Sequence, residues 1–195
     1  MKWRAASRAA SAAALKFQAS RGSAGKIRAV KKPRPPEDPD SSKAAYSRAL
    51  RWLTARELSE GQVRSRLADQ GYTDTAINPA VERLLQDRTI DDRRAATAVA
   101  RTEARVRRHG PHRVMGKLLA MRIDRDLAKD IVKDLFGEED EEALLEKTLD
   151  IRLRGNPERL KDPRERRKIL AYLVRQGFSA STASTAIRNK SKRSK

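Results

Sequence analysis

The feature that most constrains the fold of this chain is an internal repeat. The segment Leu67–Thr73 reads LADQGYT, Leu173–Ser179 reads LVRQGFS, and a weaker copy, LLAMRID, runs over Leu118–Asp124. The leading leucines are 51 and 55 residues apart. A period of this length is typical of a chain built from stacked copies of one small unit, each too small to bury much surface alone.

Each position of this repeat predicts the end of one helix and the start of the next. The leucine lies on a last helical turn, and the glycine at positions 71 and 177 supplies the left-handed residue that ends the helix. The following Tyr, Ile or Phe fills the gap between helices, and Thr73, Asp124 or Ser179 then caps the next helix. In the weaker copy, Arg122 stands where glycine is favoured, at a cost of about 1 kcal/mol if it is left-handed.

Further start signals precede a second helix in each copy. A capping oxygen stands three residues before Gln or Glu in both Ser59–Gln62 and Asp162–Glu165. In the middle copy, Pro111 follows Gly110 and takes the first helical position, where proline is favoured. Every copy therefore contains a helix before the repeated segment and a helix after it.

The first helix of each copy is predicted from apolar residues at helical spacing, over residues 43–58, 92–109 and 140–154. Proline interrupts the third helix of the first copy. That helix begins either directly after the repeated segment or at Asn78, with Pro79 in its first turn.

No stretch alternates convincingly as a strand does, so the sequence predicts an all-α fold. Three-helix repeats cover residues 41–88, 89–137 and 138–188, and we expect them to stack into an elongated, curved array. The residues expected to face the core are Tyr46, Leu50, Leu53, Leu67, Tyr72, Ile77, Val81, Leu85, Ala95, Ala96, Val99, Val106, Leu118, Ile123, Ala128, Val132, Phe136, Leu145, Leu149, Leu153, Leu173, Phe178, Ala183 and Ile187.

The net positive charge is concentrated at the two ends, with about +7 in residues 1–40 and +5 in residues 188–195. The chain has 45 Lys and Arg against 26 Asp and Glu, a formal net charge of +19. The end segments bury too little apolar surface to fold, so we expect residues 1–40 and 189–195 to be disordered basic tails. We interpret the first tail as a generic basic tail, with an arm that gathers polyanions or a targeting segment as the alternatives. No apolar run approaches the roughly 18 residues of a membrane span, and we expect a cytoplasmic protein.

The sequence contains little that could perform catalysis. It has no cysteine, which excludes disulfides, cysteine-ligated metals and cysteine nucleophiles. His109 and His112 have arginine neighbours rather than metal ligands, so we expect a solvent-facing or phosphate-contacting pair. Asp91 and Asp92 are interpreted as helix caps, and the acidic run 138–142 as a solvated helix start or a joint that repels nucleic acid. We predict no enzyme, no cofactor and no metal site.

A stripe of arginines follows the predicted helix 92–109. At about 100° per residue its members fall within about 60° of one another, while the apolar residues lie on the other side. The stripe continues into the next helix start, and the whole set is named here the basic rim: Arg94, Arg101, Arg105, Arg108, Arg113 and Lys117. A charged stripe is often only a solvated face. Charge of a single sign instead favours contact with phosphates, without sequence specificity, or with an acidic protein.

Together these features resemble the RecX family of regulatory proteins. The resemblance rests on three tandem three-helix units, the helix end with glycine before an aromatic residue, the segment Ile90–Ala95, and the turn Arg108–Arg113. It covers residues 44–188. This chain departs from the family pattern at Arg122, in place of glycine, and in the longer connection 155–161 of the third copy.

The resemblance implies a regulator that has no catalytic residue. RecX-like proteins bind the RecA recombinase, above all its filament on single-stranded DNA, and inhibit its ATPase, strand-exchange and coprotease activities, which modulates recombination, DNA repair and the SOS response. For this chain it implies RecA as the partner, direct or indirect contact of the basic rim with DNA phosphates, and no membrane partner. A monomer is the simplest state of a capped array. The alternative is a non-specific basic DNA- or RNA-binding protein that acts without a recombinase.

Overall fold

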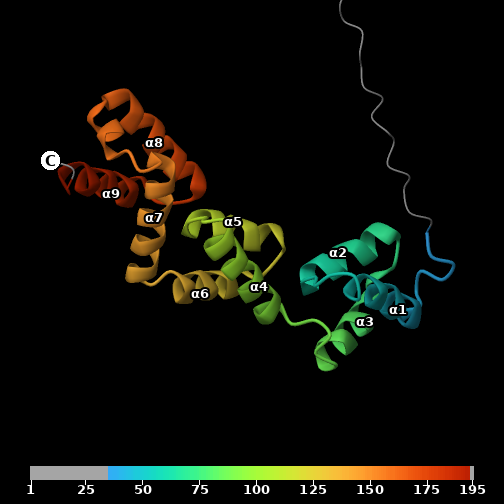
Figure 1. The fold of residues 1–195 in the computed structure, drawn as a ribbon. Helices are drawn as coiled ribbons and strands as arrows, with labels where there is room; N and C mark the ends of the chain where they lie inside the picture. Colours follow the sequence, from blue (N-terminus) through green and yellow to red (C-terminus); the bar gives the residue numbers. More distant parts are fainter. Residues whose placement is uncertain (1–34, 194–195) are drawn as a thin grey trace, which may run out of the picture. The chain divides into compact units, whose positions relative to one another are not determined.

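The computed structural model describes residues 35–193, apart from the side chains of residues 138–140. Within this part the chain forms nine α-helices, one π-helical turn and one 3-10 helix, with no strand (Figure 1). The all-α fold of tandem three-helix repeats is therefore confirmed. Most of the predicted N-terminal tail, residues 1–34, and the last two residues of the C-terminal tail lie outside the described residues.

The first repeat contains α1 (Ser42–Leu53), α2 (Glu60–Gln70) and α3 (Asp74–Gln86). Ser59 begins α2 through a capping box, which satisfies backbone N–H groups that have no partner inside the helix. Gly71 ends α2 in the left-handed region, with φ 96°. Both helix boundaries were predictable because they depend on local backbone chemistry.

The core of the first repeat differs from the sequence prediction along α1. Ala45 and Ala49 are fully buried, while Tyr46, Leu50 and Leu53 are only partly buried. The small alanine side chains let α1 pack directly against α3, which displaces the larger side chains to the edge of the contact.

The start of α3 settles the alternative raised by its proline. The helix begins at Asp74 and carries Pro79 in its interior, so the alternative start at Asn78 is wrong. Thr73 occupies the cap position, but its hydroxyl donates a hydrogen bond to the Asp40 carboxylate at 2.6 Å and makes no cap bond to α3. The segment before α1 is thereby tied to the end of α2.

The second repeat contains α4 (Asp92–Arg101), the π-helical turn Thr102–Val106, α5 (Pro111–Ala120) and α6 (Arg125–Leu135). The sequence predicts one continuous α-helix over 92–109 in place of α4 and its π-helical turn. A π-helical turn contains more residues per turn than an α-helix, so every residue after it is rotated about the helix axis.

This rotation explains one of the two predicted core residues that the structure exposes. Val106 is 69 % exposed, and Glu103 is buried in the same turn, with 4 % exposed. In the first repeat Leu85 is 37 % exposed, while Leu84 is fully buried. Helical spacing explains that difference, because the buried face that includes Val81 reaches Leu84 three residues later.

The third repeat contains α7 (Glu138–Leu153), the 3-10 helix Pro157–Lys161, α8 (Pro163–Gln176) and α9 (Ala180–Arg193). The C-terminal boundary differs from the prediction, because α9 continues through residues 189–193, which the sequence places in the tail.

Ion pairs hold this last part of α9 against α7. Lys190 pairs with Asp150 at 2.7 Å, and Arg193 lies 3.5 Å from Glu146. Basic composition alone does not reveal this order, because the partner carboxylates lie some forty residues earlier in the chain.

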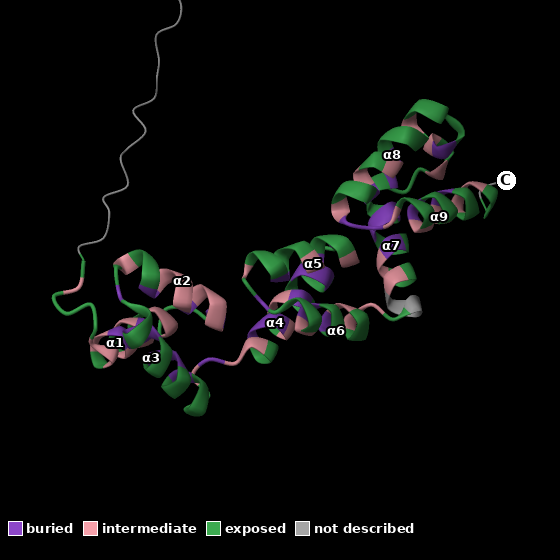
Figure 2. Ribbon diagram, turned by 180° about the vertical axis from the view of Figure 1, so that it is seen from behind, coloured by how far each residue is buried: buried purple, intermediate pink, exposed green. Residues whose placement is uncertain are grey.

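Each repeat encloses a core of its own, and the buried residues lie on the inner faces of its three helices (Figure 2). The equivalent leucines Leu67, Leu118 and Leu173 are all fully buried. Tyr72 and Phe178 fill the predicted gaps, with 7 % and 1 % exposed. The repeated segment therefore buries equivalent residues in the core of each copy.

Consecutive repeats are joined at equivalent positions, which we call the junctions. At the first junction the Ser59 hydroxyl, at the start of α2, donates to the backbone carbonyl of Met121, at the end of α5. At the second, the Gly110 N–H, at the start of α5, donates to the carbonyl of Gln176, at the end of α8, at 2.8 Å. The start of the second helix in one repeat thus packs on the end of the second helix in the next.

Both junctions require a residue without a Cβ atom. A Cβ on Gly61 would lie 2.6 Å from the Arg122 Cβ, and one on Gly110 would lie 2.7 Å from the Gly177 carbonyl. Arg122 has φ 59°, so it adopts the left-handed conformation that the repeat predicts for this position. The first junction is therefore built on a left-handed arginine and the second on a left-handed glycine.

Candidate partner-binding groove

Two of the six basic-rim residues connect neighbouring repeats. The Arg94 guanidinium in α4 lies 3.1 Å from the carboxylate of Glu57, in the loop before α2. Arg113, in α5, donates to the backbone carbonyl of Arg175 in α8 at 2.9 Å. In both contacts the arginine guanidinium group is already bonded within the protein and is less available to a binding partner. These two residues therefore support the arrangement of the repeats.

The other four basic-rim residues are exposed and have no ion pair among the described residues. Arg101 and Arg105 line a cavity between α4 and α6, and Arg105 and Arg108 line a second cavity between the second and third repeats. Lys117 lies on the exposed side of α5 and lines neither cavity. The structure thus brings three of the six predicted residues together.

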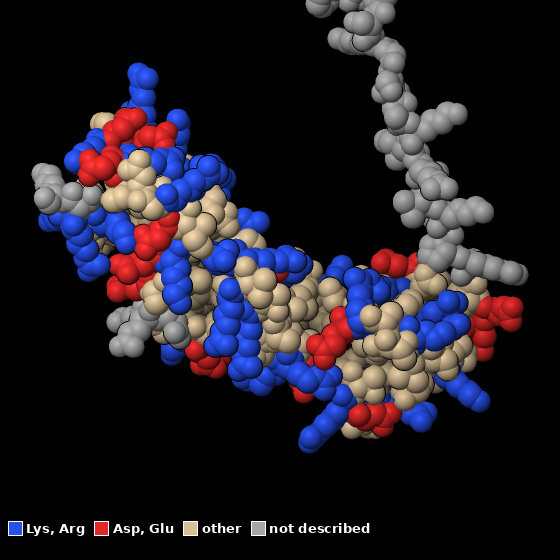
Figure 3. Space-filling model, viewed as in Figure 1, with Lys and Arg blue, Asp and Glu red and all other residues tan. Residues whose placement is uncertain are grey.

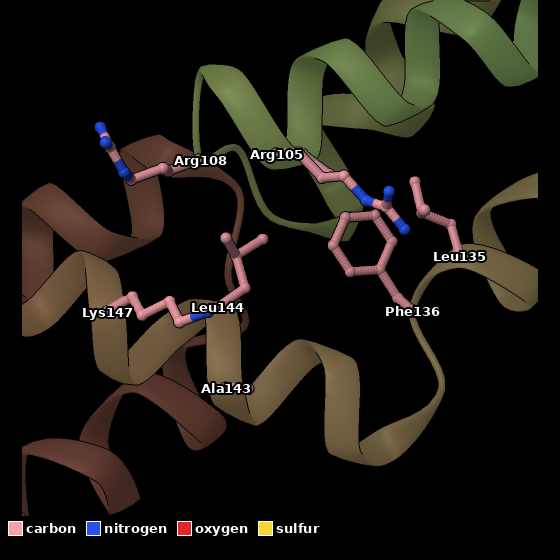
Figure 4. Close-up of a pocket in the computed structure, with 8 residues that line it drawn as sticks. Arg105, Arg108, Leu135, Phe136, Ala143, Leu144 and Lys147 are labelled. Carbon is pink, nitrogen blue, oxygen red and sulfur yellow. The ribbon is translucent and has the colours of Figure 1, made fainter.

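The two cavities adjoin, because they share Arg105 and Leu135, and we name them together the central groove. The α4–α6 cavity has a volume of about 240 Å³ and is lined by Arg93, Thr97, Ala100, Arg101, Arg105, Ile131, Asp134 and Leu135. The second cavity has a volume of about 320 Å³ and is lined by Ala104, Arg105, Arg108, Leu135, Phe136, Ala143, Leu144 and Lys147 (Figure 4).

The central groove combines an apolar floor with an excess of cations. Among the described side chains, five of lysine and arginine line it, and one carboxylate, that of Asp134. Lysine and arginine side chains also gather on the surface over α4–α6 (Figure 3). Cations without nearby carboxylates attract polyanions, since binding releases the counterions of the polyanion.

Sequence reasoning missed two residues of the groove. Arg93 precedes the stripe and lies outside its angular range, and Lys147 belongs to α7 in the next repeat. No periodic signal within one helix could have revealed Lys147, because its place in the groove depends on how the second and third repeats pack.

A buried charge cluster fixes the turn that carries the groove arginines. The Glu103 carboxylate lies 2.6 Å from Nδ1 of His109 and accepts a hydrogen bond from Arg107 at 2.9 Å. Glu103 is 4 % exposed and His109 9 %. The prediction of a solvent-facing histidine pair is therefore wrong for His109, while His112 is exposed.

The same cluster shapes the π-helical turn. The Arg107 N–H donates to the Thr102 carbonyl at 3.2 Å, which closes the π-helical turn, and the His109 N–H then donates to the Glu103 carbonyl at 3.0 Å. Arg108 then adopts φ 59°, a left-handed conformation that costs an arginine about 1 kcal/mol. As a result Arg105 and Arg108 line the same cavity. The contacts of buried Glu103 with His109 and Arg107 offset the strain of the left-handed arginine.

Two of the carboxyl groups with shifted pKa values connect neighbouring segments outside the groove. Hydrogen bonds from Lys168 and Arg159 hold the pKa of Glu165, in α8, at about 2, below its ordinary 4.5. Burial raises the pKa of Asp92, which accepts a hydrogen bond from the Glu60 backbone N–H at 2.7 Å. Both groups hold neighbouring segments together, and neither lines the groove.

Within residues 35–193, leaving out the side chains of 138–140, no group of three or more histidine, aspartate or glutamate residues is placed to hold a metal ion. No described helix is long and apolar enough to cross a bilayer.

Comparison with known proteins finds matches to a single family. A family model described as "RecX, first three-helix domain" matches residues 45–84. The regulatory protein RecX of Syntrophotalea carbinolica is 34% identical over 137 residues, which cover 70% of this chain and 89% of the relative. The regulatory protein RecX of Prosthecochloris aestuarii is 30% identical over 146 residues, which cover 74% of this chain and 91% of the relative.

A solved structure has the same fold. The crystal structure of RecX from Lactobacillus salivarius superposes with a TM-score of 0.64 at 22% sequence identity, over 77% of this chain and 97% of the other. Identity of 34% to a relative that is covered over 89% of its length, together with the shared fold, establishes that this chain belongs to the RecX family of regulatory proteins.

Proposed function

We propose that this protein binds the RecA recombinase in its filament on single-stranded DNA and inhibits the recombinase's ATPase, strand-exchange and coprotease activities. Membership of the RecX family is the observation that carries the proposal. The central groove supports it, because three basic-rim arginines meet there without carboxylate partners among the described residues. The proposal assigns no reaction to the chain itself and places it in the cytoplasm as a monomer.

Inhibition follows from differential binding. A ligand shifts a conformational equilibrium only by its difference in affinity for the two states. If the groove binds the assembled filament more tightly than the state through which the filament turns over ATP, the rearrangement coupled to hydrolysis becomes unfavourable. The junctions contribute because they hold three repeats together, so that several surfaces bind the filament at once.

The test is the recombinase ATPase rate on preformed filaments, with this protein added below one molecule per DNA site. The proposal expects inhibition at these substoichiometric amounts. Inhibition that begins only when the protein saturates the DNA would support the alternative, a general nucleic-acid-binding protein that competes for DNA.

A triple variant tests the groove. Changing Arg101, Arg105 and Arg108 to glutamate together should abolish inhibition and leave helicity intact, since the three side chains are exposed. The matched control changes exposed arginines outside the groove and the junctions to glutamate, with the same change in net charge: Arg51, Arg125 and Arg164. If both triple variants lose inhibition equally, net charge and not the groove is responsible.

A further inference from the structure

We propose that the cavity between the second and third repeats binds one unstacked base of a single-stranded nucleic acid, against the ring of Phe136. This inference rests on the proposed function, in which the groove binds a recombinase filament assembled on single-stranded DNA. Proteins that bind single strands combine a cationic groove that follows the backbone with an aromatic ring on which a base stacks. The cavity contains both features.

Phe136 differs from the other aromatic residues of the described part of the chain. Three of those rings are covered by arginine guanidinium groups, and two are buried in the cores. The covered rings are Tyr46, Trp52 and Tyr172, with guanidinium groups 4.5, 5.8 and 4.8 Å from the ring centres. The buried rings are Tyr72 and Phe178. Phe136 is half-buried, lines a cavity and has no guanidinium stacked over it, among residues 35–193.

The surroundings of Phe136 suit a nucleotide. In Figure 4 the ring is seen face-on, with the Arg105 side chain beside it and Leu144 rising from α7 across the cavity. The volume of about 320 Å³ is at the lower end of the range for small-ligand pockets, enough for one base with its sugar. Base and sugar would be enclosed by Phe136, Leu135 and Leu144, which are apolar.

The flanking phosphates would meet the cations of the cavity wall. Arg105, Arg108 and Lys147 line this cavity, and no acidic side chain among those described does. Arg105 also lines the adjoining cavity, where Arg101 and Arg93 add two more guanidinium groups, and where Asp134 is the one carboxylate among the described side chains. A strand whose base enters at Phe136 therefore has a line of guanidinium groups for its next phosphates.

The experiment compares two ligands that share their phosphates and differ in their bases. Fluorescence anisotropy measures binding of the full chain to labelled ten-nucleotide oligothymidylate and to an abasic oligonucleotide of the same length, at one low salt concentration. We expect oligothymidylate to bind about tenfold more tightly. Charge in the N-terminal segment acts on both ligands alike, so it cancels in the ratio.

The Phe136→Leu variant keeps an apolar side chain in the cavity and removes the stacking surface. It should reduce the ratio to about one and leave the abasic affinity unchanged. Tyr172→Leu is the matched control, because this ring is already covered by Arg152, and it should keep the tenfold ratio. Circular dichroism confirms that both variants are folded.

The outcomes separate this inference from the proposed function. A ratio of one in the unchanged protein, or a tenfold ratio that persists in Phe136→Leu, overturns the base site. The former is also the result expected of a groove that binds an acidic peptide, because such a groove makes no contact with a base. Recombinase inhibition that still depends on Arg101, Arg105 and Arg108 would then leave the proposed function standing.

Discussion

The second junction makes a sharp prediction about Gly110. A Cβ at this position would lie 2.7 Å from both the carbonyl carbon and oxygen of Gly177, and 2.8 Å from the Phe178 nitrogen. Ordinary contact begins at 3.4 Å, so in Gly110→Ala the two backbones must separate by about 0.7 Å. The backbone of Gly110 itself is compatible with alanine, because its φ is −77°. The substitution therefore tests the contact alone.

The cost follows from what the separation breaks. The hydrogen bonds from the Gly110 N–H to Gln176 and from the His112 N–H to Gly177, now 2.8 and 3.0 Å long, would both be lost or strained. Each contributes about 1 kcal/mol, and residual overpacking adds about 1 kcal/mol more. The expected loss in the free energy of unfolding is about 3 kcal/mol.

Gly116 provides the matched control within the same helix. It lies inside α5, and nothing lies within 4 Å of where its Cβ would stand. Gly116→Ala should therefore raise the free energy of unfolding by about 0.5 to 1 kcal/mol, because alanine favours the helix. The two variants have the same change in composition and opposite expected signs.

Urea unfolding of the full chain, followed by far-ultraviolet circular dichroism, measures both variants. With an m-value of about 2 kcal/mol/M, Gly110→Ala should lower the midpoint by about 1.5 M. The transition should also broaden or divide in two, because the stability of a repeat protein includes the interfaces between neighbouring repeats. If Gly110→Ala unfolds at or above the midpoint of the unchanged protein, the close packing at the second junction is refuted.

Three further predictions concern single residues. The pKa of Glu165 is lower in the native state than in the unfolded state, so the unchanged protein should lose stability as the pH falls from about 4.5 to about 2. Glu165→Gln should lose less stability over the same range, as measured by the unfolding midpoint in an acid titration. Glu103→Leu should lower the free energy of unfolding by about 3 kcal/mol in urea, because His109 loses its buried partner; an unchanged midpoint would contradict the charge cluster. Arg122→Gly should raise the thermal midpoint by relieving about 1 kcal/mol of left-handed strain, and a lower midpoint would show that its side-chain contact at the first junction matters more.

The helix ends could be predicted from sequence because each depends on a few neighbouring residues. The capping box at Ser59, the left-handed Gly177 and the left-handed Arg122 are all present where the repeat predicts them. The equivalent leucines are buried for the same reason, since a helix three or four turns long shows its buried face in its own spacing.

The features that could not be predicted depend on contacts between distant residues or on the register of one turn. An α-helical wheel assumes a constant angle per residue, and the π-helical turn breaks that assumption at Val106. The roles of Arg94 and Arg113 depend on Glu57 and on the Arg175 carbonyl, which lie in other repeats. A pattern within one helix shows which residues share a face but not what the face meets.

One turn of the chain connects the junction with the groove. Residues 107–113 contain Arg108, which lines the cavity, and also Gly110 and Arg113, which pack and hydrogen-bond across the second junction. Lys147 reaches the same cavity only because α7 belongs to the repeat held by that junction. Loosening the junction therefore moves the two walls of the cavity apart. Gly110→Ala should thus weaken inhibition of the recombinase even though Gly110 lines neither cavity, whereas Gly116→Ala should leave inhibition unchanged.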